Sequence, residues 1–565
     1  MGDLGKSGGV AASAGDAWQN HGGLCGATAW PSPDAGISEA LSVCLRSGCL
    51  PLKGGDDGWS IVSADASLSS RLRSGLGSTT SIVDLDRRSF VGIAERMLGP
   101  RLLAQATFGL ERKQPQFSAR HVITRAQACW GLGLLVPVLM LVVLRPGSGS
   151  ALLTAAVAVG YIANAVFRAW LFWVGSDLEK APGERPSDCD ADLPVYTILI
   201  PLYREANLIP QIAEALAAID YPGDLDVKLV TEADDFETVA AIEAAALPWE
   251  CLHVPASEPR TKPKACNYAL PFARGEFLVI YDAEDRPEPD QLKKAVAAFR
   301  NGPPDVACLQ ARLNFFNAKE TRFLTRMFAL DYGLWFDYLL PGLDRLQIPM
   351  PLGGTSNHFR TAALRAIHGW DPFNVTEDAD IGIRLAQRGF RVKTLDSTTY
   401  EEATTRFGNW LRQRTRWMKG YMQTWLVHMR DPAALVRNAG WGGFLGFQLF
   451  VGGTVLSALL NPILWLTFMA TILFVPGSAA AHATMETMSV AGIVLGNALF
   501  AYLAMLGPYR RGWLELSPYG LLVPFYWLLI SVAAYRGLWQ LVRNPWHWEK
   551  TAHGLTRMQP AAHVR

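Results

Sequence analysis

The sequence carries little charge, and neither sign is in excess. Charged residues make up 18% of its 565 residues, and 52 Lys and Arg face 51 Asp and Glu. A formal net charge of +1 excludes the broad positive field that holds proteins to nucleic acid, so we expect no nucleic-acid partner. Hydrophobic residues reach 50%, which excludes a chain that is disordered throughout. Any function that depends on charge must therefore be local.

Cysteine is also scarce. The eight cysteines include no CxxC pair, so the sequence predicts neither a zinc site nor a disulfide framework, and it fits a reducing cytosol. Residues 1–35 are rich in Gly, Ala and Ser and lack the basic, apolar and small-residue pattern of a signal peptide. We therefore expect a disordered tail that stays in the cytosol.

Long apolar runs begin at Ala128–Leu144 and Ala151–Phe167, which flank a Pro-Gly-Ser-Gly-Ser turn. Each run is close to the length that crosses a bilayer, so the sequence predicts a transmembrane hairpin over residues 126–174. Arg168 follows the second run and is expected to snorkel from the helix end toward the membrane surface. Residues 175–440 contain no spanning run, which predicts a soluble domain of ordinary size.

Apolar runs return at Phe444–Phe474, Met488–Gly507 and Tyr519–Tyr535, which predicts transmembrane helices over residues 441–542. The first of these is long for one span. Two passes there would keep the basic segment 543–565 in the cytosol, whereas one pass would put it outside, and the positive-inside rule favours two. We therefore predict six spans in a bacterial-type inner membrane, with the 175–440 domain in the cytosol.

The soluble domain alternates strands with helices. Val195–Ile200 and Asp226–Thr231 each precede a helical stretch, and Glu276–Tyr281 is an apolar run short enough for a strand buried on both faces. This pattern predicts an α/β domain with a doubly wound, mostly parallel sheet. Ligands bind such sheets beyond the carboxyl ends of the strands, where this sequence repeatedly places acidic residues.

Asp282 and Glu284 follow the Glu276–Tyr281 strand directly. Carboxylates at i and i+2 of a turn can hold one hard divalent cation, which keeps its other positions for phosphate oxygens and water. A solvated acidic turn before the next helix is an equal alternative.

Glu232 and Asp234 end another predicted strand and offer acceptors to the base or ribose of a nucleoside. Lys262 and Lys264 add fixed positive charge that suits a diphosphate. An acidic loop and a basic surface loop are the alternatives, and each motif taken alone is weak.

Glu377, Asp378 and Asp380 open a predicted helix, with Thr376 in position to cap it. Dipole compensation explains one or two of these acids, but three in four residues less well. A carboxylate held there, partly desolvated, can act as a general base toward an attacking hydroxyl.

Gln413, Arg416 and Trp417 lie within an aromatic and basic stretch, Trp410 to Trp425. On a helix the amide has Arg416 at i+3 and Trp417 at i+4, so one face presents groups that suit a pyrophosphate and a sugar ring. An amphipathic helix at the membrane interface is the competing interpretation, and both can hold at once.

These four elements, in this order between apolar runs, resemble the membrane-bound family 2 glycosyltransferases, the group of the cellulose, curdlan and hyaluronan synthases. The resemblance covers about residues 191–429. It implies a GT-A fold, a nucleotide-diphosphate sugar donor, for which we expect a UDP-sugar, Mg²⁺ or Mn²⁺ as cofactor, and inversion at the anomeric carbon. The GT-A domain would then sit within an α-helical transmembrane bundle.

The resemblance assigns roles to residues by motif. Asp282 and Glu284 match the metal-binding DxD pair, with Glu where Asp is usual. Asp378, beside Glu377, matches the catalytic base, and Trp417 matches the acceptor-binding position. The residues expected at the nucleotide sugar are Glu205, Glu232, Asp234, Lys262, Asp282, Gln413 and Arg416.

Two further segments show looser resemblances. The aromatic cluster near Trp548, Lys550 and Thr551 resembles a gating loop that closes over the nucleotide, with an interfacial anchor as the alternative. Residues 40–120 predict a small α/β module, of which Phe90–Phe108 resembles part of the N-terminal domain of type II secretion ATPases and suggests regulation.

The function expected from these patterns is transfer of sugar to a growing polysaccharide, coupled to its export across the lipid bilayer and with possible export or regulatory partner proteins. One alternative is a non-processive transferase that acts on a lipid-linked acceptor. The other is an inactive scaffold or regulatory subunit.

Overall fold

The structure is a computed structural model. It describes residues 39–53, 59–75, 80–176, 192–319, 322–474 and 480–550. The tail expected at residues 1–35 lies outside the described residues, as do Thr551 and the rest of the C-terminal segment after residue 550.

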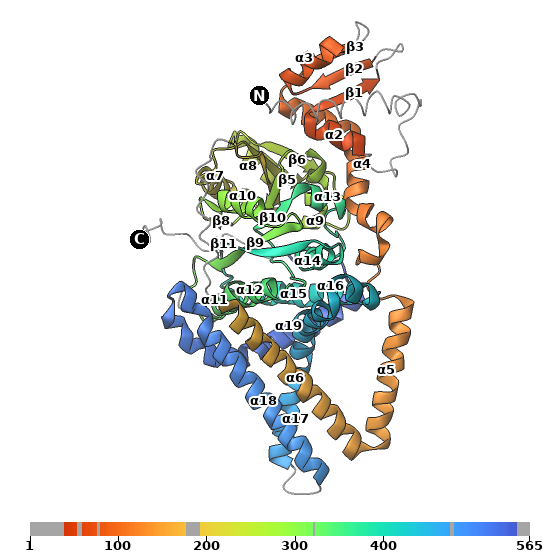
Figure 1. Cartoon of the computed structure of the whole chain (residues 1–565), viewed down its shortest axis with the longest axis vertical. Helices are drawn as coiled ribbons and strands as arrows, with labels where there is room; N and C mark the ends of the chain where they lie inside the picture. The colour runs from red at the N-terminus through yellow and green to blue at the C-terminus, as the bar shows by residue number, and fades with distance from the viewer. Residues whose placement is uncertain are drawn as a thin grey trace.

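A small α/β module stands at the N-terminal end of the molecule (Figure 1). Its strands pair in the order β1-β2-β3, with β1 and β2 antiparallel and β2 and β3 parallel. The elements are α2 (Glu39–Ser47), β1 (Cys49–Lys53), β2 (Trp59–Ser63), α3 (Ala66–Gly75), β3 (Thr80–Asp84) and α4 (Arg87–Lys113). The long helix α4 leaves the module and packs on the next domain, because its buried Leu98 and Leu102 share a core with Leu252 and Val254.

An eight-stranded sheet forms the central domain, in the order β6-β5-β4-β7-β10-β9-β11-β8. The strands are β4 (Tyr196–Leu202), β5 (Leu225–Glu232), β6 (Glu250–Val254), β7 (Phe277–Ile280), β8 (Arg286–Pro287), β9 (Val306–Phe315), β10 (Asn357–Arg360) and β11 (Arg391–Glu401). The β6-β5-β4-β7 half is parallel, and β9 pairs parallel with β11. β10 is antiparallel to both neighbours and β8 is antiparallel to β11, so the sheet is mixed.

The buried runs explain the parallel half. Every residue of β7 is buried and β4 is buried except at Pro201, as expected of strands covered by helices on both faces. β4 and β5 closely match the predicted strands Val195–Ile200 and Asp226–Thr231, and each is followed by a helix, as predicted. The antiparallel β10 was not anticipated, since Asn357–Arg360 is polar and carries no apolar run.

Helices of the central domain cover the sheet, and some of them lie between the sheet and the apolar helices (Figure 1). They are α7 (Ile209–Ala217), α8 (Phe236–Ala244), α9 (Lys262–Ala269), α10 (Gln291–Asn301), α11 (Phe323–Leu334), α12 (Leu340–Arg345), α13 (Thr361–Ala366), α14 (Glu377–Gln387) and α15 (Phe407–His428).

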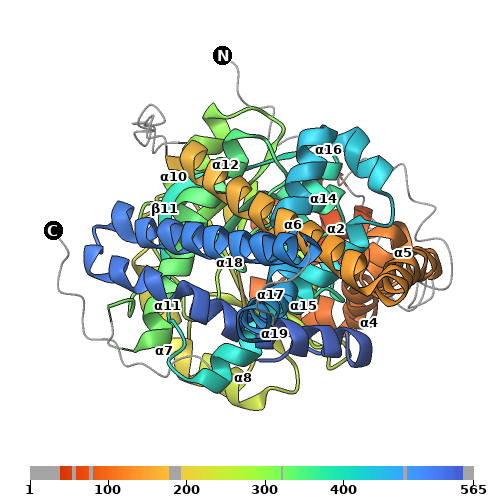
Figure 2. The same ribbon diagram turned by 90° about the horizontal axis from the view of Figure 1, so that it is seen from below.

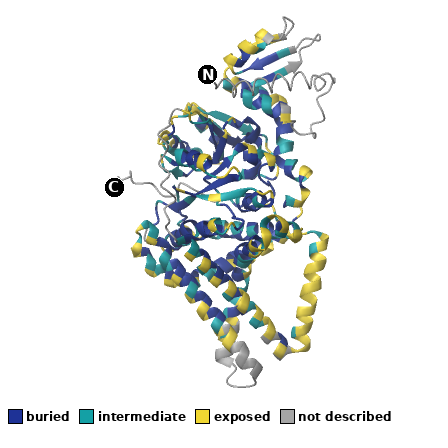
Figure 3. Cartoon of the chain, viewed as in Figure 1, coloured by how far each residue is buried: buried dark blue, intermediate teal, exposed yellow. Residues whose placement is uncertain are grey.

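Within the described residues, five helical segments are long and apolar enough to cross a membrane. They are built from α5 (Arg125–Leu144), α6 (Pro146–Ser176), α16 with α17 (Pro432–Phe447 and Gly453–Phe474), α18 (Ala480–Leu506) and α19 (Val523–Arg543). Figure 3 shows α5 exposed along its whole length, whereas α6 and α18 pack on each other.

The division of Phe444–Phe474 into two spans is wrong. A π-helical turn, Gln448–Gly452, joins α16 to α17, and Pro462 lies inside the helix, so the segment continues to Phe474 as one helical path. The paired glycines allow close approach of neighbouring groups instead of a reversal. A Cβ atom on Gly452 would lie 2.9 Å from the Trp425 indole nitrogen, and one on Gly453 would lie 3.0 Å from the Asn164 side chain.

The positive-inside rule led to the prediction of six spans because we assumed that the last apolar helix runs away from the central domain. It does not. α19 lies along α15 in the same direction: Trp410 donates to the Tyr526 hydroxyl (3.1 Å), and further along Arg536 donates to the Thr415 hydroxyl (3.2 Å). Seen from below, α19 crosses beneath the central domain (Figure 2). The described part of the C-terminal segment, up to residue 550, therefore returns to the central domain.

Candidate active site

Two cavities meet at the edge of the sheet. The sheet-edge cavity has an empty volume of about 1250 Å³ and is lined by the ends of β4 and β5 and by the C-terminal segment. The membrane-side cavity, of about 1270 Å³, is lined by α11, α14, α15 and membrane helices. The residues common to both are Lys262, Asp282, Glu284, Arg416 and Trp548. Asp282, Asp378 and Trp417, far apart in the sequence, therefore share one cavity.

Lys262 joins the acidic turn to the helix that carries Asp378. Its ammonium group contacts the Asp282 carboxylate and donates to the Gly354 carbonyl at 2.7 Å. Gly354 faces Asp378, since a Cβ atom there would lie 3.4 Å from an Asp378 oxygen. Burial lowers the pKa of Lys262, but the charges of Asp282 and Glu377 outweigh it, so the pKa is raised and the cation is kept.

The acidic turn fits a shared divalent cation. Asp282 is 34% exposed where the cavities meet, whereas Glu284 is buried beside it. Among the described residues no group of three acidic, His or Cys side chains converges on a metal position. Two carboxylates leave most coordination positions of a bound cation to other ligands. They therefore suit Mg²⁺ or Mn²⁺ that is held partly by substrate phosphates, and not by the protein alone.

The acids at the start of α14 divide into two roles. Glu377 and Asp378 line the membrane-side cavity, whereas Asp380 is fully buried and faces Arg384. Burial raises the pKa of Asp378 to about 6, and burial with the neighbouring Asp378 charge raises the pKa of Glu377 to about 8. A carboxylate with a pKa near 6 is ionised at neutral pH and still basic enough to take a proton.

Thr376 does not cap α14, contrary to the sequence prediction. Its hydroxyl lies 3.5 Å from the Asn374 side-chain oxygen, and no side-chain capping bond forms. The reason is the close crossing of α15 at Gly420, where a Cβ atom would lie 2.2 Å from the Thr376 hydroxyl oxygen. Only glycine allows this approach, which presses α15 against the start of α14.

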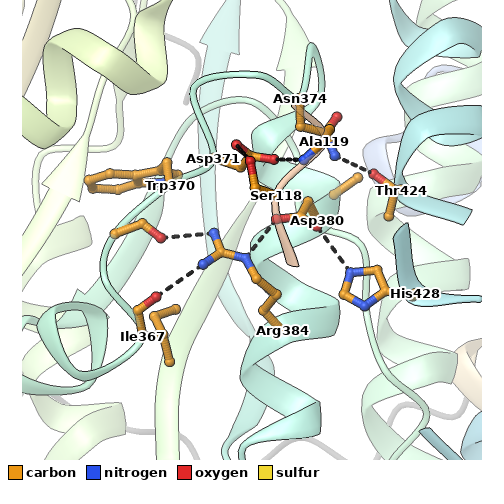
Figure 4. Close-up of polar contacts among 12 residues, drawn as sticks. Ser118, Ala119, Ile367, Trp370, Asp371, Asn374, Asp380, Arg384, Thr424 and His428 are labelled. Carbon is orange, nitrogen blue, oxygen red and sulfur yellow. Dashed lines mark hydrogen bonds and ion pairs between the residues drawn. The ribbon is translucent and has the colours of Figure 1, made fainter. Parts of the chain in front are cut away.

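A buried polar network supports α14 from behind (Figure 4). Asp380 pairs with Arg384 at 2.6 Å and with His428 at 3.0 Å, and Arg384 donates to the Ile367 and Gly369 carbonyls. These contacts fix the rotation of the helix that presents Asp378.

The loop before α14 is held by the segment that follows α4 (Figure 4). The Asp371 carboxylate accepts the Ala119 backbone N–H at 2.5 Å and the Ser118 hydroxyl at 3.2 Å. Burial, with the charge of Asp380, raises the pKa of Asp371 to about 7. From the other side, Thr424 of α15 accepts the Asn374 amide at 3.0 Å.

The α15 face predicted from sequence lines the cavities. Gln413, Arg416 and Trp417 all border the membrane-side cavity, and the buried Gln413 side-chain oxygen has no hydrogen-bond partner within the described structure. The Trp417 ring stacks near Tyr332, with centroids 6.1 Å apart. α19 packs along the same helix.

The predicted nucleotide-binding acids separate. Glu232 lines the sheet-edge cavity and pairs with Lys264 at 3.0 Å, and Glu205 lines it as well. Asp234 instead pairs with Arg260 at 2.6 Å and is not among the described residues that line the cavity. Glu232 is therefore the better placed of the two alternatives.

The C-terminal segment closes the sheet-edge cavity. Trp548 lies over Arg416, with the guanidinium carbon 4.7 Å from the ring centroid, and Lys550 pairs with Glu205 at 3.3 Å. Both residues line the cavity. Thr551, predicted with them, lies outside the described residues.

Sequence reasoning missed several lining residues. Glu401 ends β11 at the cavity, and an acid after a strand is a signal that was available for it. Asp331, which pairs with Arg414 at 2.7 Å, and Arg168 lie on helices with no local pattern to mark them. Arg168 was expected to snorkel, but it is only 4% exposed and turns into the membrane-side cavity.

Residues 194–420 match the family described as "Glycosyltransferase like family 2". The matched residues contain the mixed sheet with its parallel half, which is GT-A-like, and apolar helices follow it in the C-terminal region.

Curated relatives match this domain at moderate identity. A β-monoglucosyldiacylglycerol synthase of Trichormus variabilis is 27% identical over 253 residues, covering 43% of this chain and 53% of the relative. A probable glucomannan 4-β-mannosyltransferase of Arabidopsis thaliana is 27% identical over 238 residues, covering 40% and 43%. The chain therefore spans about half the length of these relatives.

Among solved structures, a mannosyltransferase of Pyrobaculum calidifontis in complex with GDP-Man and Mn²⁺ is similar over 68% of this chain and 99% of its own. The sequence identity is 23% and the TM-score is 0.44.

Proposed function

We propose that this protein is an inverting membrane glycosyltransferase that uses a nucleotide-diphosphate sugar. The observation that carries the proposal is the junction of the two cavities at Lys262, Asp282 and Arg416. A donor in the sheet-edge cavity would present its sugar at this junction, and an acceptor in the membrane-side cavity would meet it there.

The donor would lie between Glu232 and the C-terminal segment, with its diphosphate near Lys262 and Arg416. Asp282 and Glu284 would hold Mg²⁺ or Mn²⁺, which neutralises diphosphate charge when bound. A UDP-sugar is the donor that we expect from the sequence resemblance.

The reaction would be a single displacement. An acceptor hydroxyl gives its proton to the Asp378 carboxylate while its oxygen bonds to the anomeric carbon. The bond from that carbon to the diphosphate breaks, and the diphosphate leaves with the electron pair. The cationic side chains of Lys262 and Arg416 stabilise its negative charge. Trp417 and the aromatic wall of the cavity would exclude water.

We further propose four membrane crossings, made by the hairpins α5/α6 and α17/α18, with the transferase domain on the cytosolic side of a bacterial inner membrane. α19 contacts α15 at Tyr526 and again at Arg536, which supports a position at the membrane surface. Exposed apolar residues such as Phe525, Val532 and Val542 would face lipid there.

The acceptor is best explained as a molecule that stays at the level of the membrane surface. Beyond Arg168 the described helices pack closely: Tyr161 bonds Asn497 (3.3 Å), and Asn164 bonds Ser457 (2.8 Å). A Cβ atom on Gly496 would lie 2.3 Å from the Tyr161 ring. This packing favours a lipid-linked acceptor over a polymer threaded through the bundle, and polymer export with partner proteins stays a prediction.

The test is a transfer assay with the full chain in lipid bilayers. Radiolabelled UDP- and GDP-sugars are supplied with Mg²⁺ or Mn²⁺, and product is separated into a lipid extract and a size-fractionated polymer. We expect label in the lipid extract, lost in Asp378→Asn. Polymer as the main product would favour export, and no nucleotide release with any donor would leave the inactive scaffold.

A further inference from the structure

The membrane-side cavity has a buried cation at its far end. Arg168 lies on α6, eight residues before the helix ends at Ser176, beside the transferase domain. At 1.5 Å per residue this is about 12 Å along the helix from the end that packs on the central domain.

Arg168 forms no salt bridge among the described residues. Its hydrogen-bond partners are neutral: Nε donates to the Asn164 amide oxygen at 3.3 Å, and Nη2 donates to the Thr454 hydroxyl at 2.6 Å. The charge of Asp331 acts on Arg168 through space, but that carboxylate is paired with Arg414 at 2.7 Å. A buried charge with neutral partners is costly in a membrane helix, and such residues usually serve a ligand.

Aromatic rings surround the guanidinium. Its central carbon lies 5.9 Å from the Trp335 ring centroid, 5.4 Å from Phe450 and 5.8 Å from Phe500. These faces stabilise the cation and hold the fork in place, but they supply no counter-charge. The fixed fork of an arginine binds phosphate or carboxylate oxygens in pairs.

We propose that Arg168 binds the acidic headgroup of a lipid acceptor while the hydroxyl of the same molecule lies at Asp378. Both residues line one cavity, so a single headgroup can satisfy both. The position of Arg168 on a helix long and apolar enough to cross a membrane, and the closed packing beyond it, favour a membrane lipid over a soluble phosphate. This inference names the acceptor class and rests on the proposed transfer reaction only for the use of Asp378.

Binding of lipids to the purified full chain tests the proposal without turnover. Fluorescent phosphatidylglycerol is the acidic probe, and fluorescent diacylglycerol with the same acyl chains is the neutral one. We expect the wild type to bind the acidic probe about ten-fold more tightly, and Arg168→Gln, which removes the positive charge, to lose this preference. Arg168→Lys is expected to keep part of it.

Arg510→Gln is the matched control. Arg510 lies at the same end of the bundle, over the Tyr338 ring, but it is not among the described residues lining the membrane-side cavity. The preference should survive in this variant. Equal binding of both lipids by the wild type, or a preference retained in Arg168→Gln, would overturn the proposal.

Two further measurements distinguish a lipid headgroup from a soluble anion, and failure of the headgroup site from failure of the transfer reaction. Displacement of the acidic lipid by glycerol phosphate at lipid-like concentrations would assign the site to a soluble anion and reject the lipid assignment. Donor hydrolysis by the wild type without acceptor is measured as a separate readout of the transfer site. If the wild type hydrolyses no donor but still prefers the acidic lipid, the transfer function fails and the headgroup site stands.

Discussion

The Arg416 guanidinium carbon lies 4.7 Å from the centre of the Trp548 ring, and its Nη1 donates to the Glu549 carbonyl at 3.0 Å. One residue comes from the helix that lines the membrane-side cavity, and the other comes from the C-terminal segment over the sheet-edge cavity. The pair thus links the membrane-side cavity to the C-terminal segment that closes the sheet-edge cavity.

Trp548→Ala should loosen this cover. A cation–π contact of about 0.5–2 kcal/mol would be lost, so the donor KM should rise by a factor of roughly 2–30 with a smaller change in kcat. Steady-state kinetics with varied donor measures both constants. Trp539→Ala, which removes an exposed indole from α19 away from the cavities, should leave them unchanged. A selective fall in kcat would argue against a role in donor retention.

Activity should depend on pH through Asp378. The base must be ionised to accept a proton, and its pKa is raised to about 6, so kcat should fall as the pH drops through 6. Lys262 and Arg416 favour the ionised form, whereas burial opposes it. A pH profile between pH 5 and 8 measures the inflection, and Asp378→Asn should lower the rate by roughly 10²–10⁴ at every pH. A flat profile would remove Asp378 from the proton transfer.

Gly420→Ala should displace the start of α14. The added Cβ atom would lie 2.2 Å from the Thr376 hydroxyl oxygen, so overpacking should cost about 1–3 kcal/mol and lower kcat. Thermal unfolding and kinetics check the two effects. Gly408→Ala, on the same helix, would meet only an Arg412 nitrogen at 4.0 Å and should have little effect. Equal behaviour of the two variants would show that α15 does not position the base.

Asp371→Ala should weaken the contact between the segment that follows α4 and the loop before α14. The buried Ala119 N–H and Ser118 hydroxyl would lose their acceptor, at a cost of about 1–3 kcal/mol for an unsatisfied buried group. The midpoint of thermal unfolding should fall, together with kcat. Ser118→Ala removes one donor and should have a smaller effect. A fall in stability without any change in kcat would confine Asp371 to a structural role.

Chelation of divalent cations should abolish transfer, and Asp282→Asn should weaken recovery on adding Mg²⁺ or Mn²⁺. The reason is that two carboxylates with open positions leave the diphosphate to complete the coordination. A titration of each metal against activity measures the apparent affinity. Asp234→Asn, outside the cavity lining, serves as the matched control. Full activity after chelation would reject the metal assignment.

The amino-acid sequence by itself determined the parallel strands of the central domain and the local positions of its acids. Continuous apolar runs such as that of β7 can be buried only as strands covered on both faces, and the acids at Asp282 and Glu232 must then follow at the strand ends. The pattern of Gln413, Arg416 and Trp417 likewise fixed one helix face, because helical spacing alone brings them together.

Tertiary structure decided how these pieces meet. The sequence carries no signal that β10 inserts antiparallel between β7 and β9, or that α19 runs along α15. The place of β10 depends on a short polar strand that shows no apolar periodicity. The place of α19 depends on contacts with residues more than a hundred positions away in the sequence. The inward turn of Arg168 is of the same kind, because an arginine near a helix end snorkels or is buried according to what the neighbouring helices place around it.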